Sequence, residues 1–170
     1  MRLNQSRVTR FLDCQQLYAW EFEEGLVAKH TPIPLLTGGA LHKGLEVLRS
    51  GKEKPLKAAM QALENHYRVI VEEENKLQVY DPVELGEMEI QILWGKMMLH
   101  RFVSQFPNPE WQVLQPEVKG EAQLGDTDHV LVFTVDGLMQ YLGRIWIGEY
   151  KTKNRVTAPY LRSYDMAKQI

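Results

Sequence analysis

The sequence predicts an α/β domain in which a small mixed β-sheet is flanked by helices. Apolar residues recur at helical spacing up to about residue 110, and beyond it they alternate with polar residues as they do in strands. Two later segments, residues 129–137 and 144–152, are separated by a short connection that ends at Gly143, which is typical of an antiparallel hairpin. The expected order is therefore helices, then a small sheet, then a final helix over residues 157–170.

Length and composition favour one globular unit. A chain of 170 residues suits a single domain with its own hydrophobic core. We expect this domain to span residues 1–170, mainly helical over residues 1–110, with the sheet and the final helix in residues 111–170. Apolar content of 44% and charged content of 25% are ordinary for a soluble protein, and no apolar run approaches membrane-spanning length.

The single cysteine and the first residues indicate the compartment. Cys14 excludes an internal disulfide and fits a reducing environment, and we expect its side chain to be buried as a small hydrophobe. Residues 1–6 lack the apolar core of a signal peptide. The prediction is a cytoplasmic, intracellular protein with no membrane association.

Charge is distributed unevenly along the chain. The formal net charge is only -2, which does not by itself indicate nucleic-acid binding. Residues 64–89 carry a net charge of -6, whereas residues 144–170 carry +4. The basic part follows the hairpin, as expected if an anionic polymer backbone binds there.

Four helices are expected before residue 110, at residues 6–24, 37–49, 55–74 and 81–106. Ser6 is the expected N-cap of the first helix, and residues 31–34 are expected to form a loop because of their prolines. Asp81 with Glu84 forms a capping-box pattern at the start of the fourth helix. His42 is expected near the start of the second helix, beside small residues that allow close approach of another backbone or a ligand.

The hairpin ends in charged residues. In a strand over residues 144–152, Glu149 and Lys151 share one face, and pairing with the preceding strand brings Asp136 near Glu149. Two carboxylates beside a lysine are a chemical set that can hold a hard divalent cation and place an ammonium group next to a reacting group.

Five short motifs occur in order along the chain. They are Ser6-x(4)-Phe11-x-x-Cys14, Gly39-x-x-His42, Glu117, Val135-Asp136-Gly137 and Glu149-Tyr150-Lys151-Thr152. With these motifs the chain resembles the PD-(D/E)XK nuclease superfamily over nearly its whole length. More narrowly, it resembles the RecB-type branch, which includes helicase-associated exonucleases and CRISPR-associated relatives. The last motif is the most specific, and the resemblance implies a restriction-endonuclease-like fold.

The resemblance also implies a site. Asp136 and Glu149 match the two carboxylate metal ligands, the backbone carbonyl of Tyr150 is the expected third oxygen, and His42 matches the histidine that joins the metal in this branch. Lys151 is then expected to steady the attacking hydroxide or the scissile phosphate. The implied cofactor is Mg2+ or Mn2+, which would make water nucleophilic and stabilise the charge that develops at phosphorus.

The chain departs from the family pattern in three places, the first of which is Cys14-Gln15 where relatives usually have Cys-Pro. Iron-sulfur members use one N-terminal and three C-terminal cysteines, so Cys14 alone predicts no cluster here. The family's Gln-x-x-x-Tyr helix would begin at Gln169, which suggests a fragment or a truncated member.

Plainer interpretations stay open for each residue. Glu149 and Lys151 can form an ordinary surface ion pair, and His42 can bond to Glu46 instead of a metal. Glu117 is expected either to help orient the metal site or bind a second ion, or to be an ordinary carboxylate on an edge strand. The candidate DNA-binding residues, which can equally form a solvated surface, are Lys153, Arg155, Arg162, Lys168 and Gln169.

The predicted function is a metal-dependent deoxyribonuclease, an exonuclease in DNA repair, recombination or CRISPR-type processing. Its expected partners are DNA and a helicase or another recombination protein. The alternative is a non-catalytic DNA-binding or assembly module of a helicase-nuclease complex that keeps the nuclease-like fold. The sequence leaves digestion polarity, strand preference, DNA versus RNA, and oligomeric state open.

Overall fold

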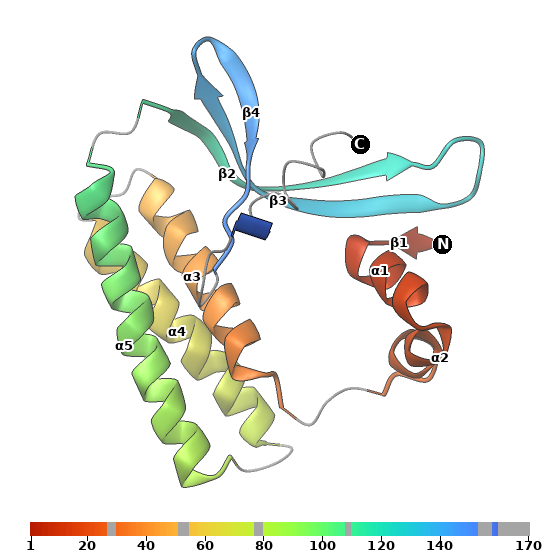
Figure 1. Ribbon diagram of the computed structural model, residues 1–170, viewed down its shortest axis with the longest axis horizontal. Helices are drawn as coiled ribbons and strands as arrows, with labels where there is room; N and C mark the ends of the chain where they lie inside the picture. The colour runs from red at the N-terminus through yellow and green to blue at the C-terminus, as the bar shows by residue number, and fades with distance from the viewer. Residues whose placement is uncertain (27–29, 51–54, 77–79, 108–109, 153–157, 160–170) are drawn as a thin grey trace.

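The computed structural model describes residues 1–26, 30–50, 55–76, 80–107, 110–152 and 158–159. Three long helices form one layer, and a twisted four-stranded sheet lies beside them (Figure 1). The N-terminal helices lie under the far end of the longest hairpin of the sheet. The prediction of an α/β fold with a small mixed sheet flanked by helices is confirmed. Among the described residues, no helix has the length and apolar character needed to cross a membrane.

The N-terminal segment is a short strand followed by broken helix. Strand β1 (Arg2–Leu3) leads into α1 (Gln5–Asp13), α2 (Gln15–Tyr18) and the π-helix η1 (Ala19–Glu23). The expected cap, Ser6, was wrong: Asn4 is the N-cap, and its side-chain oxygen accepts a hydrogen bond from the backbone N–H of Arg7 at 2.8 Å. Cys14 is exposed, contrary to expectation, because it occupies the extended break between α1 and α2.

The helical layer consists of α3 (Ile33–Arg49), α4 (Pro55–Asn75) and α5 (Pro82–Gln105). The Asp81–Glu84 capping box that starts α5 is confirmed. Helix α3 begins earlier than predicted, because Pro34 is tolerated in the first helical turn. As a result His42 lies in the middle of α3 and not near its start.

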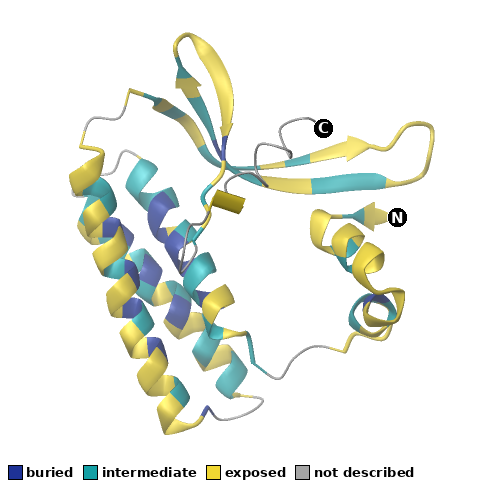
Figure 2. Cartoon of the chain, in the orientation of Figure 1, coloured by how far each residue is buried: buried dark blue, intermediate teal, exposed yellow. Residues whose placement is uncertain are grey.

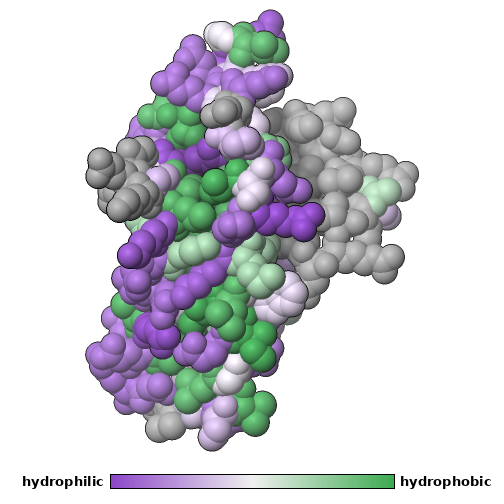
Figure 3. Space-filling view, turned by 90° about the vertical axis from the view of Figure 1, so that its left-hand side faces the viewer, coloured by the Kyte–Doolittle hydropathy of each residue, from purple (hydrophilic) through white to green (hydrophobic). Residues whose placement is uncertain are grey.

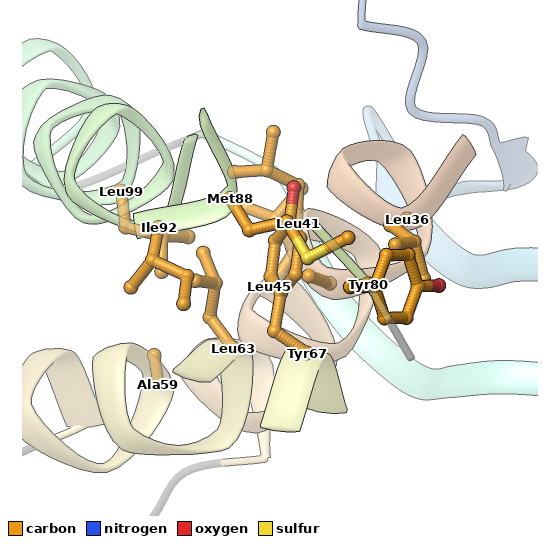
Figure 4. Packing of buried hydrophobic residues seen from close by; sticks show 11 residues of the cluster. Leu36, Leu41, Leu45, Ala59, Leu63, Tyr67, Tyr80, Met88, Ile92 and Leu99 are labelled. Carbon is orange, nitrogen blue, oxygen red and sulfur yellow. The ribbon is translucent and has the colours of Figure 1, made fainter. Parts of the chain in front are cut away.

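The hydrophobic core lies between these three helices (Figures 2 and 4). Leu36 and Leu41 of α3, Leu63 and Tyr67 of α4, and Leu99 of α5 are almost completely buried. Gly44 makes the close packing possible, since a Cβ there would lie 2.8 Å from the Leu99 side chain and 3.2 Å from the Ala59 carbonyl. The small residues of α3 therefore serve helix–helix contact.

The sheet is centred on β3 (Val130–Tyr141). Strand β2 (Gln112–Gln123) pairs with it along one edge, antiparallel. On the other edge, β1 pairs parallel to the start of β3 and β4 (Arg144–Gly148) pairs antiparallel to its end. The result is a mixed sheet in which β3 carries the candidate site.

The β3–β4 hairpin is confirmed, but its second strand is shorter than predicted. Leu142 and Gly143 connect the strands, both with positive φ (49° and 70°), as a tight two-residue hairpin turn requires. Strand β4 ends at Gly148, so Glu149 and Lys151 lie in the segment that follows and not on a strand.

Glu74 of α4 holds the start of the segment that leads into α3. Its carboxylate accepts hydrogen bonds from the backbone N–H of Thr31, at 3.1 and 3.2 Å, and from the Tyr80 hydroxyl. Burial raises the pKa of Glu74, but the hydrogen bonds from Thr31 and Tyr80 outweigh it and leave the pKa below its ordinary value. The ionised carboxylate therefore stabilises the folded state.

Glu74→Gln is expected to lower the free energy of unfolding at neutral pH, and the difference from the parent is expected to shrink in acid. A carboxyl group with a lowered pKa in the folded state stabilises above its unfolded pKa, ordinarily 4.5, and loses this effect as the pH falls through the folded value. Urea denaturation of both proteins across this range measures the difference. A difference that does not change with pH would contradict the prediction.

Candidate active site

Asp136 lies where the sheet meets the helical layer. It is near the middle of β3, one residue before the point where pairing with β4 begins. One carboxylate oxygen, Oδ1, lies 3.0 Å from Nδ1 of His42 on α3. The other, Oδ2, accepts a 2.6 Å hydrogen bond from the backbone N–H of Tyr150. Three separate segments of the chain therefore converge on a single carboxylate.

The segment after β4 is fixed by the side chain of Tyr150. The ring packs against the helical core, edge-on to the rings of His42 and Phe102, at centroid distances of 6.4 and 6.5 Å. Burial raises the pKa of the Tyr150 hydroxyl, and the charge and hydrogen bond of Arg49 counteract this only in part. Tyr150 therefore stays a neutral anchor that holds its own peptide group against Asp136.

The His42–Asp136 pair suits a divalent metal ion. Neighbouring ligand atoms in octahedral coordination with bonds of about 2.1 Å are about 3.0 Å apart. The distance from Nδ1 to Oδ1 is 3.0 Å, so both atoms can turn to one ion with little movement. The site also lies at the partly exposed junction of the two layers, with the exposed fraction of the Asp136 side chain at 17% and that of His42 at 34%.

Glu149, the second predicted carboxylate ligand, engages a different partner. Its carboxylate forms an ion pair with the ammonium group of Lys151, two residues later. Across the part of the chain that the structure describes, no group of three or more His, Cys, Asp or Glu side chains is arranged to hold a metal ion. The structure therefore brings together Asp136, His42 and the Tyr150 peptide, and it leaves Glu149 paired with Lys151 beside them.

Glu117 stands across the sheet from Asp136. Its neighbours Pro116 and Val118 pair with Gly137 and Val135, which places Glu117 opposite Asp136, in a backbone conformation with φ of 45°. Its carboxylate lies 3.3 Å from the Lys119 ammonium group. Because positive φ is unusual for a residue with a side chain, the position of Glu117 is set by the surrounding structure.

Two further titratable residues lie near His42: Lys43 follows it on α3, and His66 of α4 packs against α3. The pKa of Lys43 on α3 is raised chiefly by its hydrogen bond to Glu46, with a smaller contribution from Glu117. Glu46 is therefore hydrogen-bonded to Lys43, and His42 pairs with Asp136 instead of with Glu46. His66 of α4 packs against Gly39, since a Cβ at Gly39 would lie 3.0 Å from Nε2 of His66. Burial lowers the pKa of His66. His66 therefore packs as a neutral ring.

The remaining predicted residues fall outside the described ranges. These are the candidate DNA-binding residues Lys153, Arg155, Arg162, Lys168 and Gln169. The predicted final helix over residues 157–170 also lies outside them, apart from residues 158 and 159, which are helical.

The group that supports Tyr150, the guanidinium of Arg49, was not predicted from the sequence. The Arg49 guanidinium lies over the rings of Phe102 and Trp111, at 4.8 and 5.6 Å from the centroids. The only signal in the sequence was that Arg49 follows His42 at helical spacing on the same side of α3. Its aromatic partners come from α5 and from the segment before β2, and no local pattern connects them.

Comparison with known proteins identifies the family of the chain. A family model described as the PD-(D/E)XK nuclease superfamily matches residues 2–169. No match was found among curated proteins or among solved structures. Proteins of this superfamily are generally nucleases that use divalent metal ions such as Mg2+, and the fold is restriction-endonuclease-like. The match covers almost the whole sequence, including every residue of the site, and the chain belongs to the PD-(D/E)XK nuclease superfamily.

Proposed function

We propose that this protein is a divalent-metal-dependent deoxyribonuclease of the RecB type, acting as an exonuclease on DNA. The observation that carries the proposal is the double engagement of Asp136, by His42 on one oxygen and by the Tyr150 peptide on the other. A carboxylate held in this way, between a helix and a sheet, is preorganised for a metal ion.

In this proposal the metal ligands are Asp136, His42, Glu149 and the Tyr150 carbonyl. The Glu149 side chain is 43% exposed, so a change of rotamer can release it from Lys151 toward the ion. A bound Mg2+ or Mn2+ supplies Lewis acidity and a more acidic water. Oxygen ligands suit both ions, and the imidazole of His42 shifts the preference toward Mn2+.

Lys151 is proposed to orient the scissile phosphate or the attacking hydroxide. The Lys151 side chain is half-exposed and its ammonium group pairs with Glu149. Because Lys151 directly follows Tyr150, the packing of the Tyr150 ring also limits the positions that the Lys151 side chain can take. Glu117 is proposed to orient the site from across the sheet. Binding of the DNA backbone is assigned to the basic residues 153, 155, 162 and 168 and to Gln169.

The proposal is tested by incubating the purified protein with end-labelled linear DNA and with closed circular DNA in Mg2+ or Mn2+. We expect linear DNA to be degraded from its ends, circles to survive, and EDTA to stop the reaction. Cleavage of circles would establish an endonuclease and overturn the exonuclease assignment. Absence of cleavage with either ion would overturn the enzymatic assignment.

The second candidate is a non-catalytic DNA-binding or assembly module of a helicase-nuclease complex. The ion pair between Glu149 and Lys151 favours it, because it occupies two predicted catalytic side chains with each other. Calorimetric titration with Mn2+ separates the two functions. Binding that Asp136→Asn and Glu149→Gln both remove supports the enzyme, whereas DNA binding without metal binding supports the module.

A further inference from the structure

Helix α5 carries a row of exposed side chains on the side away from its buried residues. We call the row the α5 seam: Val83, Glu87, Ile90, Trp94, Met97, Met98 and Arg101. Most neighbours in the row are three or four residues apart, with Met97 and Met98 adjacent, and on average the row lies roughly 140° around the helix from the buried residues of α5. Ile90, Trp94 and Met97 are each more than half exposed, at 53%, 54% and 60%.

The seam lies on the outer side of the helical layer. Helix α5 forms the left-hand edge of Figure 1, whereas Asp136 is on β3, beyond α3. Figure 3 faces this edge, and hydrophobic surface recurs along its length between hydrophilic side chains. Exposed isoleucine, tryptophan and methionine side chains in a row along one helix are typical of a protein interface.

The charged residues of α5 are segregated along its length. Acidic side chains lie in its first half, and Lys96 and Arg101 lie in its second half. Glu84 belongs to the capping box, Glu89 pairs with Arg68, and Lys96 pairs with Glu64. Within the described residues, Glu87 and Arg101 form no ion pair. These two residues stand seven positions before and seven positions after Trp94, with Ile90, Met97 and Met98 between them.

We propose that the α5 seam binds the α5 seam of a second copy of this chain, antiparallel, with a two-fold axis at Trp94. This arrangement places Glu87 opposite Arg101 of the partner subunit, twice by symmetry, and Ile90 opposite Met98 of the partner subunit. In a parallel pair, Glu87 of one subunit would instead lie opposite Glu87 of the partner subunit. The spacing of the seam is the one by which two helices pack side by side.

The charges provide the first test, by sedimentation velocity over a series of protein concentrations. The parent is expected to form a dimer. Glu87→Arg and Arg101→Glu are each expected to weaken it, on the order of tenfold in dissociation constant, because two symmetry-related pairs become repulsive at once. The double variant Glu87→Arg/Arg101→Glu is expected to restore the dimer. A parent that stays monomeric, or a double variant no better than the singles, would overturn the proposal.

Matched apolar variants keep the test independent of folding. Trp94→Glu is expected to give a monomer, and Leu93→Glu, on the same helix and 61% exposed but outside the seam, is expected to leave the dimer intact. Circular dichroism and thermal melting establish that both variants are folded. Equal effects of the two variants would place the contact elsewhere and overturn the assignment.

Cysteine cross-linking tests the direction, in a Cys14→Ser background because Cys14 is exposed. In the antiparallel pair, Val83 lies opposite Gln105 of the partner subunit, and the two copies of Val83 are about 33 Å apart. The variant Val83→Cys/Gln105→Cys is therefore expected to give a covalent dimer under mild oxidation. Val83→Cys alone is expected to give none, and a covalent dimer from it would establish the parallel arrangement.

Discussion

Asp136→Asn is expected to reduce metal-dependent cleavage of DNA by at least about 100-fold. The substitution keeps the shape of the side chain, and the amide oxygen can still accept the hydrogen bond from the Tyr150 N–H. What it removes is the negative charge that faces His42 and would hold the metal ion. The initial rate on end-labelled linear DNA in Mn2+ measures the effect, and calorimetry measures the accompanying loss of Mn2+ binding.

The matched control is Asp126→Asn, an exposed aspartate in the turn between β2 and β3. It makes the same chemical change on the same hairpin and should leave the rate unchanged. Lys151→Ala separates binding from chemistry: cleavage should fall while Mn2+ binding remains, because an ammonium group is no metal ligand. Parental cleavage rates in both Asp136→Asn and Lys151→Ala would refute the roles assigned to them.

Leu63→Ala is expected to lower the free energy of unfolding by about 3 kcal/mol. Leu63 is fully buried between α3, α4 and α5, and its truncation leaves a cavity that the packed helices cannot close (Figure 4). Leu93→Ala, on the exposed side of α5, is the control and is expected to change stability by less than about 0.5 kcal/mol. Urea denaturation of both variants measures the difference.

The close approach of Leu63 to Gly95 sharpens this prediction. A Cβ at Gly95 would lie 2.8 Å from Leu63 Cδ1, so Gly95→Ala forces the leucine to move in the parent. In the Leu63→Ala background the same methyl group enters the new cavity, and alanine also favours the helix by about 1 kcal/mol. The double variant should therefore be more stable than the sum of the single effects predicts. Strict additivity would show that the two positions do not share this space.

Features with a local cause could be predicted from the sequence. The capping box at Asp81 and the turn at Gly143 each depend on a few adjacent residues, and both occur where expected. The order of helices and strands likewise follows from hydrophobic spacing. The juxtaposition of Asp136 and His42 was predicted from the family resemblance, since the intervening sequence contains no pattern that specifies it.

Features that depend on distant contacts could not be predicted. The parallel pairing of β1 with β3 joins residues 2 and 3 to residues 130 and 131, far apart in the sequence, through only two residues of strand. The end of β4 at Gly148 is set by Tyr150, whose ring leaves the sheet to pack in the helical layer. Arg49 and Trp111 complete this packing from separate elements. In each case side-chain packing between elements, and not local propensity, decides the structure.

Because the ring of Tyr150 packs among the helices and its peptide N–H donates a hydrogen bond to Asp136 of β3, Tyr150 links the helical layer to the sheet. A partial opening that frees the ring would draw the peptide group away from Asp136 while both halves are still folded. Heat or denaturant should therefore inactivate the protein before it melts, and catalytic competence becomes a sensitive indicator of how firmly the halves are joined.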